Sequence, residues 1–237
     1  MSENDDKSRA EAERRQALGD LRILDTPGEE RFDRMTRQLA EELDAPIAYV
    51  ALLDGERQWL KSEVGGMQQE MPQELSYCNH TIRQEGPLVV ADASEDERLR
   101  DLPLTQDENL RFYAGMPIQD NDGNTLGTVC VADREVRDLE PEKLAVLESY
   151  AKRVEKEILA PPTIFVSYAH EDEEWKDRLV KHCEVLRRQG LLDLWVDRDM
   201  ASGDAWREEI RDAIERAKVA ILLVSAEFLT SDFILGE

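Results

Sequence analysis

The chain has 237 residues, enough for one large domain or two small ones, and 41% of them are hydrophobic. Its 53 acidic and 30 basic residues leave a net charge of −23 at pH 7. This charge argues against non-specific binding to nucleic acid or anionic lipid, because both require a basic surface. We therefore expect neither nucleic acid nor a membrane among the partners.

Three features of the sequence predict a cytoplasmic protein. The N-terminus is polar and charged and lacks the apolar segment of a secretory signal. The longest uncharged run, Ile158–His170, is too short to span a bilayer. The chain has only three cysteines, a sparse and odd number that fits a reducing compartment better than a disulfide framework.

The first quarter of the chain predicts two helices. Residues 1–25 are highly charged and favour a helix around Arg9–Leu18. A second helix is expected to start at Thr26, which can cap it, with Pro27 at the first helical position. Its apolar residues recur at helical spacing and share one face, namely Phe32, Met35, Leu39 and Leu43.

Strand patterns follow this helix. Ile47–Leu53 is apolar and β-branched, and the turn pair Asp54-Gly55 joins it to a return strand, Gln58–Ser62. After a loop-rich stretch, three further strands are predicted at Leu88–Ala91, Arg111–Ile118 and Leu126–Ala132. Hairpin-like spacing indicates an antiparallel sheet with the preceding helix packed on one face, an α+β arrangement.

A helix with an apolar seam ends this half of the chain. Leu144, Leu147, Ala151, Val154 and Ile158 recur at the spacing of a coiled-coil seam. The sequence leaves two interpretations open. One is a single amphipathic helix that lies on the sheet, and the other is a parallel dimer helix that passes from a first domain to a second. The pair Pro161-Pro162 ends the helix and marks a domain boundary.

The remaining residues alternate between strands and helices, which predicts a parallel α/β sheet. Strands are expected at Ile164–Tyr168, Leu192–Val196 and Val219–Ser225, with helices at Glu173–Gln189 and Ala205–Ala217. The helical residues expected to face inward are Trp175, Leu179, Leu186, Trp206, Ile210, Ile214 and Ala217.

The first half resembles a GAF sensor domain. The matching stretches, in order, are FDRMTRQLAEELDAPIAYVALLDGERQWLKS, SYCNHTI, PLVVADASEDERL and RFYAGMPIQDNDGNTLGTVCVADRE. The resemblance implies an antiparallel sheet with a ligand pocket under covering loops, dimerisation through flanking helices, and control of a neighbouring output domain. The expected division is a helix at residues 1–25, the GAF-like domain at 26–138, and a connector helix at 139–160.

Residues 161–237 resemble a TIR domain, which has a flavodoxin-like α/β fold. The matching stretches are TIFVSYAHED, DLWVDRDMASGDAWREEI and VAILLVSAEFLTSDFILGE. A fold of this type has about five strands, and this chain supplies three, so we expect a truncated domain. The resemblance implies self-association with other TIR domains and, in a subset of the family, cleavage of NAD+ at the nicotinamide–ribose bond.

The resemblance assigns the catalytic role to Glu237. In the NAD-cleaving subset, a glutamate lies six residues after a serine within S-x-W-C-x-x-E. Here Ser231 precedes Glu237 at that spacing, Phe233 replaces the tryptophan and Ile234 replaces the cysteine. One carboxylate suits this chemistry, because bond cleavage builds positive charge on the ribose carbon while nicotinamide leaves as a neutral molecule.

Other residues of this half are candidates for binding NAD+, which would be a substrate, since the sequence implies no bound cofactor. Tyr168, Ala169 and His170 follow the first strand, and Asp197 and Arg198 follow the second strand. Both groups are therefore expected in one crevice. Arg198 could contact a phosphate or pair with neighbouring aspartates, and Trp206 could stack on a base or pack in the core. The candidates are Tyr168, Ala169, His170, Asp197, Arg198, Trp206 and Phe233.

In the GAF-like half, five residues are candidates to line a pocket for a small molecule that the sequence does not name: Trp59, Cys78, His80, Asp92 and Tyr113. Plain structural packing is the alternative for all five. Cys78 and His80 supply only two ligands, whereas zinc requires about four, so we expect no metal site.

The sequence therefore predicts a signalling protein in which a GAF sensor controls a TIR output and which forms a homodimer or higher oligomer. Two functions remain open. The TIR part hydrolyses NAD+, or it is a non-catalytic adaptor that only recruits other TIR domains.

Overall fold

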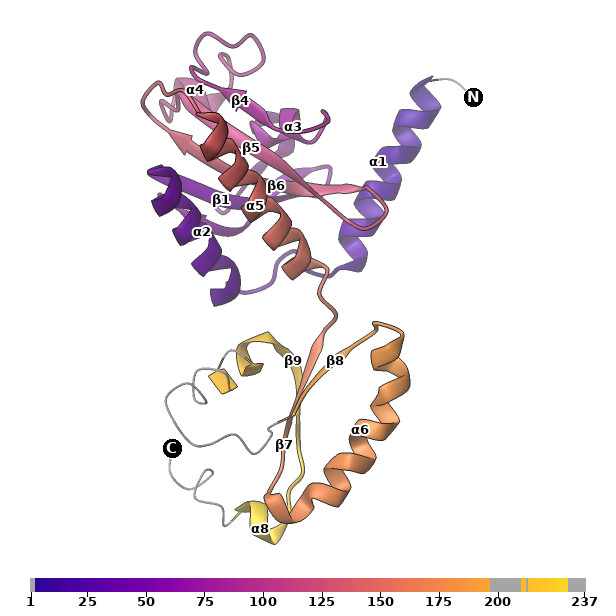
Figure 1. The fold of residues 1–237 in the computed structure, drawn as a ribbon. Coiled ribbons are helices and arrows are strands. Elements are labelled where there is room, and N and C mark those ends of the chain that lie inside the picture. Colours follow the sequence, from indigo (N-terminus) through magenta and orange to yellow (C-terminus); the bar gives the residue numbers. More distant parts are fainter. Residues whose placement is uncertain (1–2, 197–209, 212, 230–237) are drawn as a thin grey trace. The chain divides into compact units, whose positions relative to one another are not determined.

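The structure is a computed structural model that describes residues 3–196, 210–211 and 213–229. The chain divides into two compact units, Met1–Leu159 and Ala160–Glu237, which we call unit 1 and unit 2 (Figure 1). Each unit is described by itself.

Among the described residues of unit 1, six strands form one antiparallel sheet. The sequence predicted the antiparallel sheet and five of its strands, and it did not predict β3. Their order across the sheet is β3-β2-β1-β6-β5-β4, and every pair of neighbours is antiparallel. The central strand β1 therefore pairs with β2 through a short turn and with β6, which is distant in sequence. The strands are β1 (Ile47–Leu53), β2 (Arg57–Val64), β3 (Glu70–Pro72), β4 (Leu88–Val90), β5 (Phe112–Gln119) and β6 (Thr125–Asp133).

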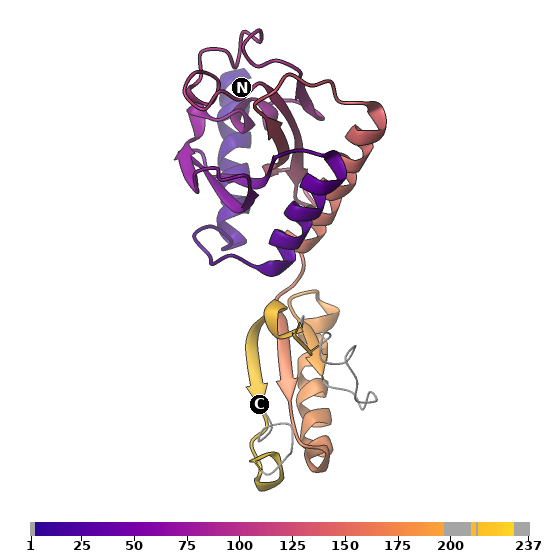
Figure 2. The same ribbon diagram turned by 90° about the vertical axis from the view of Figure 1, so that its left-hand side faces the viewer.

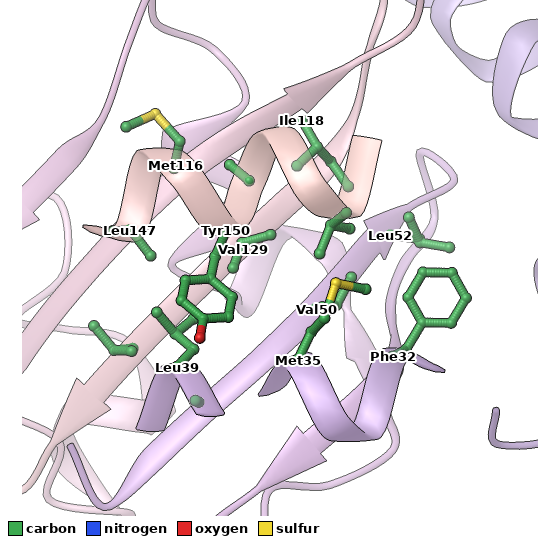
Figure 3. Packing of buried hydrophobic residues seen from close by; sticks show 14 of the residues in the cluster. Phe32, Met35, Leu39, Val50, Leu52, Met116, Ile118, Val129, Leu147 and Tyr150 are labelled. Carbon is green, nitrogen blue, oxygen red and sulfur yellow. The ribbon is translucent and has the colours of Figure 1, made fainter. Parts of the chain in front are cut away.

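Two helices cover one face of this sheet. Helix α2 (Glu30–Leu43) and helix α5 (Pro141–Ile158) run side by side along it (Figures 1 and 2). Figure 3 shows their apolar side chains meeting those of the strands: Phe32, Met35 and Leu39 from α2, Leu147 and Tyr150 from α5, and Val50, Leu52, Met116, Ile118 and Val129 from the sheet. We call this the helix-covered face.

The seam of α5 is used inside unit 1. Leu147, Ala151, Val154 and Ile158 are all buried in the core of the helix-covered face, and Leu144 packs against it. Of the two interpretations that the sequence left open, the structure therefore supports a single amphipathic helix on the sheet. A parallel dimer helix cannot use the same side chains while they are buried in this core.

Short elements and loops cover the opposite face, which we call the loop-covered face. They lie between residues 65 and 111, where the sequence predicted one strand, at Leu88–Ala91, and otherwise loops. The elements are the 3-10 turn η1 (Gln73–Leu75) and the single-turn helices α3 (Cys78–Thr81) and α4 (Pro103–Gln106). A second core cluster lies beneath them, with residues such as Tyr49, Leu60, Tyr77 and Leu104.

The predicted start of the second helix was wrong by about one turn. Helix α2 begins at Glu30, and Thr26 does not cap it but donates its hydroxyl proton to the Ile23 carbonyl. The cause is the buried ammonium group of Lys61, whose side chain is 0% exposed. It forms an ion pair of 2.5 Å with Glu29 and donates hydrogen bonds to Thr26 Oγ1 and the Pro27 carbonyl. A buried charge must be paired, so the segment before α2 wraps around Lys61 instead of forming a helix.

The N-terminal helix α1 (Glu3–Asp20) is also held by a buried charge. Arg14 is only 6% exposed, and its guanidinium group donates hydrogen bonds to the carbonyls of Leu53 and Thr125 at the ends of β1 and β6. Glu11 balances its charge at 2.6 Å. Leu18 on the same helix is buried in the helix-covered core.

Unit 2 contains a parallel sheet, as predicted. Among its described residues the strand order is β8-β7-β9, and both pairs are parallel. Its small core includes Phe165, whose ring stacks on Trp195 at 5.0 Å between ring centroids. The elements are β7 (Thr163–Ser167), η2 (His170–Asp172), α6 (Glu173–Arg188), β8 (Asp193–Val196), β9 (Ala217–Leu222) and α8 (Ala226–Leu229).

Several inward-facing helical positions predicted in unit 2 were wrong. Trp175, Leu186 and Ile214 are 61%, 41% and 53% exposed, and α6 has no buried residue, although Ile210 is buried as expected. A narrow sheet covers only part of the apolar stripe of a helix. The final strand also begins earlier, at Ala217, where the sequence predicted that the preceding helix still continued. Trp206 lies outside the described residues.

The helix-covered core gives a stability prediction. Phe32→Ala removes a ring that is 0% exposed and should destabilise unit 1 by about 3–5 kcal/mol, because the cavity cannot close completely. Hydrogen exchange at the amides of β6 measures this free energy of opening. The matched control is Glu41→Ala, an exposed position on the same helix, with an expected change within about 0.5 kcal/mol. Equal protection in both variants would contradict the described packing of α2.

Candidate functional site

The loop-covered face brings together polar side chains from four elements. Tyr49 lies on β1, Tyr113 on β5, Cys130 on β6 and Cys78 on α3, and each is at most 1% exposed. The Tyr113 hydroxyl lies 3.3 Å from Cys130 Sγ and donates a hydrogen bond to Cys78 Sγ at 3.6 Å. Cys78 and Tyr113 were both predicted as pocket residues, and the structure places them in contact. Their pocket role stays a prediction.

Hydroxyl groups connect the covering elements to the sheet and to one another. The Thr81 and Tyr113 hydroxyls of α3 and β5 lie 2.7 Å apart. The Tyr77 hydroxyl lies 2.6 Å from Thr105 Oγ1 of α4, and Thr105 donates in turn to the Leu99 carbonyl. These buried polar groups are therefore satisfied by one another, which positions α3 and α4 over the sheet.

A glycine makes room for the Tyr113 phenol. Gly115 lies on the same strand and faces Cys130 in the sheet register. A β carbon at this position would stand 2.2 Å from the Tyr113 hydroxyl oxygen. Only glycine therefore leaves space for the hydroxyl between the strands and α3.

Burial controls the ionisation of these tyrosines. Burial, together with the nearby thiols, raises the pKa of Tyr49 and Tyr113 well above the ordinary value of 10.0. Burial also raises the pKa of Tyr77, although the Thr105 hydroxyl opposes this shift. The phenols on this face are therefore neutral hydrogen-bonding groups at physiological pH.

Two further predicted pocket residues lie at the margin of this face. His80 on α3 is partly exposed, and its pKa is lowered by burial and by the positive charges of Arg83 and Arg98. Asp92 follows β4 and accepts hydrogen bonds from the backbone and hydroxyl of Ser94, which lower its pKa. Asp92 therefore stabilises its own loop, and no contact among the described residues joins it to Cys78.

The fifth predicted pocket residue, Trp59, lies on the other face of the sheet. It pairs with Leu52 in the register of β1 and β2, so both side chains point to the helix-covered core. Trp59 also lines a surface groove of about 740 Å³ together with Lys61 and Asp33. The structure does not bring Trp59 together with Cys78 and Tyr113.

Cys130 is the residue that sequence reasoning missed. Its neighbours in GTVCVAD indicate a buried strand, and an apolar interpretation of a cysteine there is ordinary. The signal that could have found it is the pairing of β5 with β6. Gly115 pairs with Cys130, and Tyr113 lies two residues from Gly115 on the same face of β5, so Cys130 lies beside Tyr113. Its second neighbour, Cys78, is 52 residues away along the chain and could not be assigned from spacing. Among the described residues, no group of three or more histidine, cysteine, aspartate or glutamate side chains could hold a metal ion.

In unit 2, the predicted residues after β7 lie at the carboxyl end of the strand. Ala169 is buried, His170 is exposed at the start of η2, and the Lys176 ammonium group lies 5.3 Å from the centroid of the Tyr168 ring. Ser225, which follows β9, donates its hydroxyl proton to Asp172 at 2.5 Å. This bond joins the segments that leave β7 and β9 at one edge of the sheet, which is where open α/β sheets bind ligands.

The other predicted residues of unit 2 lie outside the residues that the structure describes. They are Asp197, Arg198, Trp206, Phe233 and Glu237.

Comparison with known families identifies the class of protein. The GAF domain family matches residues 27–158, which is more than half of the chain, and the chain belongs to this family. The TIR domain family matches residues 164–237. The chain is a signalling protein that carries a GAF domain followed by a TIR domain.

Two curated relatives are similar to parts of the chain. One is a cyclic di-GMP phosphodiesterase, PA2567, of Pseudomonas aeruginosa, 38% identical over 143 residues, covering 59% of this chain and 24% of that protein. The other is the uncharacterized protein y4lF of Sinorhizobium fredii, 40% identical over 72 residues, covering 30% of this chain and 22% of that protein. The chain spans about a quarter of the length of these relatives.

Solved GAF domains resemble the chain at low sequence identity. The GAF domain of an Acinetobacter phosphoenolpyruvate-protein phosphotransferase is 15% identical with a TM-score of 0.47, covering 67% of this chain and 94% of that one. The corresponding domain of Coxiella burnetii is 17% identical with a TM-score of 0.43, covering 62% and 93%. Across the described part of the chain, no helix is both long and apolar enough to cross a membrane.

The buried phenols predict alkaline instability of unit 1. Because their pKa values are raised in the folded state, the folded chain holds these protons more tightly than the unfolded chain does. The resulting stability is complete below pH 10 and decreases as the pH rises further, by about 1.4 kcal/mol per pH unit for each tyrosine. Urea unfolding at several pH values, followed by tyrosinate absorbance, measures this slope.

Tyr113→Phe removes one of these buried phenols. It should therefore reduce the loss of stability above pH 10 by about 1.4 kcal/mol per pH unit. If all tyrosinate absorbance instead appeared near pH 10 in a chain that stays folded, the described burial of the phenols would be wrong.

Proposed function

We propose that unit 1 senses a small molecule and controls unit 2, which self-associates and hydrolyses NAD+ at the nicotinamide–ribose bond. Support for a sensor comes first from the GAF match and from the loop-covered face, where hydroxyls and thiols lie under short elements. Unit 2 would be the output. NAD+ is a substrate in this proposal, and no bound cofactor is required.

The relative from Pseudomonas aeruginosa supports a regulatory role for unit 1. The similar segment of 143 residues is longer than unit 2, so it must include much of unit 1. That relative is a cyclic di-GMP phosphodiesterase by name, whereas a TIR domain follows the GAF domain here. A module found beside different outputs suits sensing better than catalysis, and we do not extend phosphodiesterase activity to this chain.

One observation carries the catalytic part of the proposal. The hydrogen bond between Ser225 and Asp172 keeps the segment after β9 at the same edge as Tyr168 and His170. Glu237 follows Ser225 by twelve positions in the sequence. A carboxylate delivered there could stabilise the positive charge that develops on the ribose carbon.

Exposed apolar side chains support self-association of unit 2. Trp175, Val185, Leu191, Val219, Leu222 and Val224 are all between 52% and 62% exposed. Several exposed apolar side chains in one small unit offer area for association with another copy, whereas single ones are ordinary. The same observation favours the second candidate function, a non-catalytic adaptor that recruits other TIR domains.

The test follows nicotinamide release. The chain is incubated with NAD+ at concentrations where sedimentation shows assembly, beside a Glu237→Ala variant. We expect nicotinamide from the unchanged chain and a loss of at least about a hundredfold in the variant, because the charge-stabilising group is gone. Glu215→Ala, an exposed position of unit 2, is the matched control and should retain activity.

Two outcomes would contradict the proposal, one for hydrolysis and one for the role of Glu237. If the assembled chain releases no nicotinamide, only the adaptor function survives. If Glu237→Ala and Glu215→Ala release nicotinamide equally, Glu237 is not the catalytic residue.

A further inference from the structure

The two buried cysteines of unit 1 form a close pair to which the proposed function assigns no reaction. Cys78 Sγ and Cys130 Sγ lie 3.6 Å apart, and both side chains are 0% exposed. A disulfide bond has a sulfur–sulfur distance of about 2.05 Å, so a movement of about 1.5 Å would join them. The two residues come from opposite layers, α3 and the central part of the sheet.

The surroundings of the pair differ from those of structural cysteines, which are inert in apolar cores. Besides Tyr113, Tyr49 is in reach of Cys78, with 3.8 Å between Sγ and the hydroxyl oxygen. Cys130 donates its thiol proton to Thr128 Oγ1 at 3.0 Å. Three hydroxyl groups therefore face two sulfur atoms in a space closed to water.

Hydrogen bonding makes the two thiols unequal. Burial acts to raise the pKa of Cys78, but hydrogen bonding with Cys130, Thr128, Tyr113 and Tyr49 outweighs it and lowers the pKa below its ordinary value. Burial raises the pKa of Cys130. Cys78 thus ionises first, as expected for an attacking thiol beside a second thiol that stays protonated.

We propose that Cys78 and Cys130 are a redox modification site, at which a hydroperoxide converts the two thiols into an intramolecular disulfide. The inference concerns unit 1 alone and does not depend on NAD+ hydrolysis by unit 2.

The reaction proceeds in two balanced steps. The Cys78 thiolate attacks one oxygen of hydrogen peroxide, the O–O bond breaks, and the product is a sulfenic acid with one water after protonation. The Cys130 sulfur then attacks the Cys78 sulfur, the S–S bond forms, and the hydroxyl leaves as a second water with the proton of Cys130. Two thiols are oxidised and one peroxide is reduced to two waters.

Access to the pair is through the covering layer. Cys78 lies on α3, a single turn of four residues held by Thr81 and Tyr77, whereas Cys130 is on a central strand. Short elements open at lower free energy than central strands do. Opening of α3 therefore exposes the attacking thiol first and leaves the sheet intact.

The experiment uses the full chain with Cys183→Ser, which removes the third cysteine and leaves the pair. After one equivalent of hydrogen peroxide under native conditions, we expect loss of both free thiols, a mass decrease of about 2 Da, and recovery with dithiothreitol. Peptide mapping without reductant should find Cys78 linked to Cys130. In Cys183→Ser/Cys130→Ala, the disulfide should be absent, and dimedone should label Cys78 as the sulfenic acid.

Two tyrosine variants test whether the hydroxyl groups around the sulfur atoms affect the rate of oxidation, or whether the short distance between the sulfur atoms alone accounts for it. Tyr113→Phe removes the hydroxyl that contacts both sulfurs and should slow oxidation by about tenfold, the effect of one hydrogen bond to a charged group. Tyr150→Phe removes a hydroxyl of the helix-covered face, which contacts Glu42 and not α3, and it should oxidise at the unchanged rate.

The inference is overturned if native Cys183→Ser keeps both thiols while the guanidinium-unfolded chain is oxidised, or if the disulfide found joins two chains. Both results are measured on the Cys183→Ser chain, so they count against the proposal even if the Cys130→Ala variant folds poorly. Equal rates for Tyr113→Phe and Tyr150→Phe would overturn the role of the hydroxyl.

Discussion

Strand β1 is buried on both of its faces, and the rest of unit 1 depends on this constraint. All seven of its residues are buried, and alternate side chains enter two different cores. Ala48, Val50 and Leu52 point to the helix-covered face, whereas Tyr49 and its alternate neighbours point to the loop-covered face. A strand of this kind requires two separate covers, one of helices and one of loops. The neighbouring strands inherit the same division through their register with β1.

The two covers have different physical character. The helix-covered face is filled by aliphatic and aromatic side chains from long elements, which suits stability. The loop-covered face contains tyrosine hydroxyls and thiols that bond to one another under elements of only a few residues. Each buried polar group of such a layer is hydrogen-bonded to a neighbouring group. A change in one group therefore alters the free energy of the whole layer. We therefore expect signals to act on the loop-covered face.

The sequence predicted the sheet well because alternation and turn pairs are local signals. Ile47–Leu53 and Asp54-Gly55 predicted the β1–β2 hairpin, and the βαβ rhythm after Pro161-Pro162 predicted the parallel sheet. Local patterns do not reveal which face of one strand continues on the next. Trp59 was therefore grouped with Cys78, although its register partner Leu52 places it on the other face.

The remaining differences arise from tertiary contacts and from partial cover. Thr26 and Pro27 form a good helix start, but the buried ammonium group of Lys61 binds them in another conformation. In unit 2, the helical period of α6 predicted an inward Trp175, which the structure leaves exposed. Periodicity indicates an apolar stripe, but the width of the sheet beneath decides how much of the stripe is covered. The carboxylate proposed for catalysis, Glu237, lies outside the described residues.

Gly115 has a consequence that reaches beyond its own strand. Because Gly115 has no β carbon, the Tyr113 oxygen can occupy the space beside it. A β carbon at this position would lie 2.2 Å from that oxygen. A single added carbon would expel that oxygen and leave the two sulfur atoms without their nearest phenol. The redox character of the cysteine pair is thus encoded partly by a residue that has no side chain, and a search for thiol chemistry among reactive residues alone would overlook it.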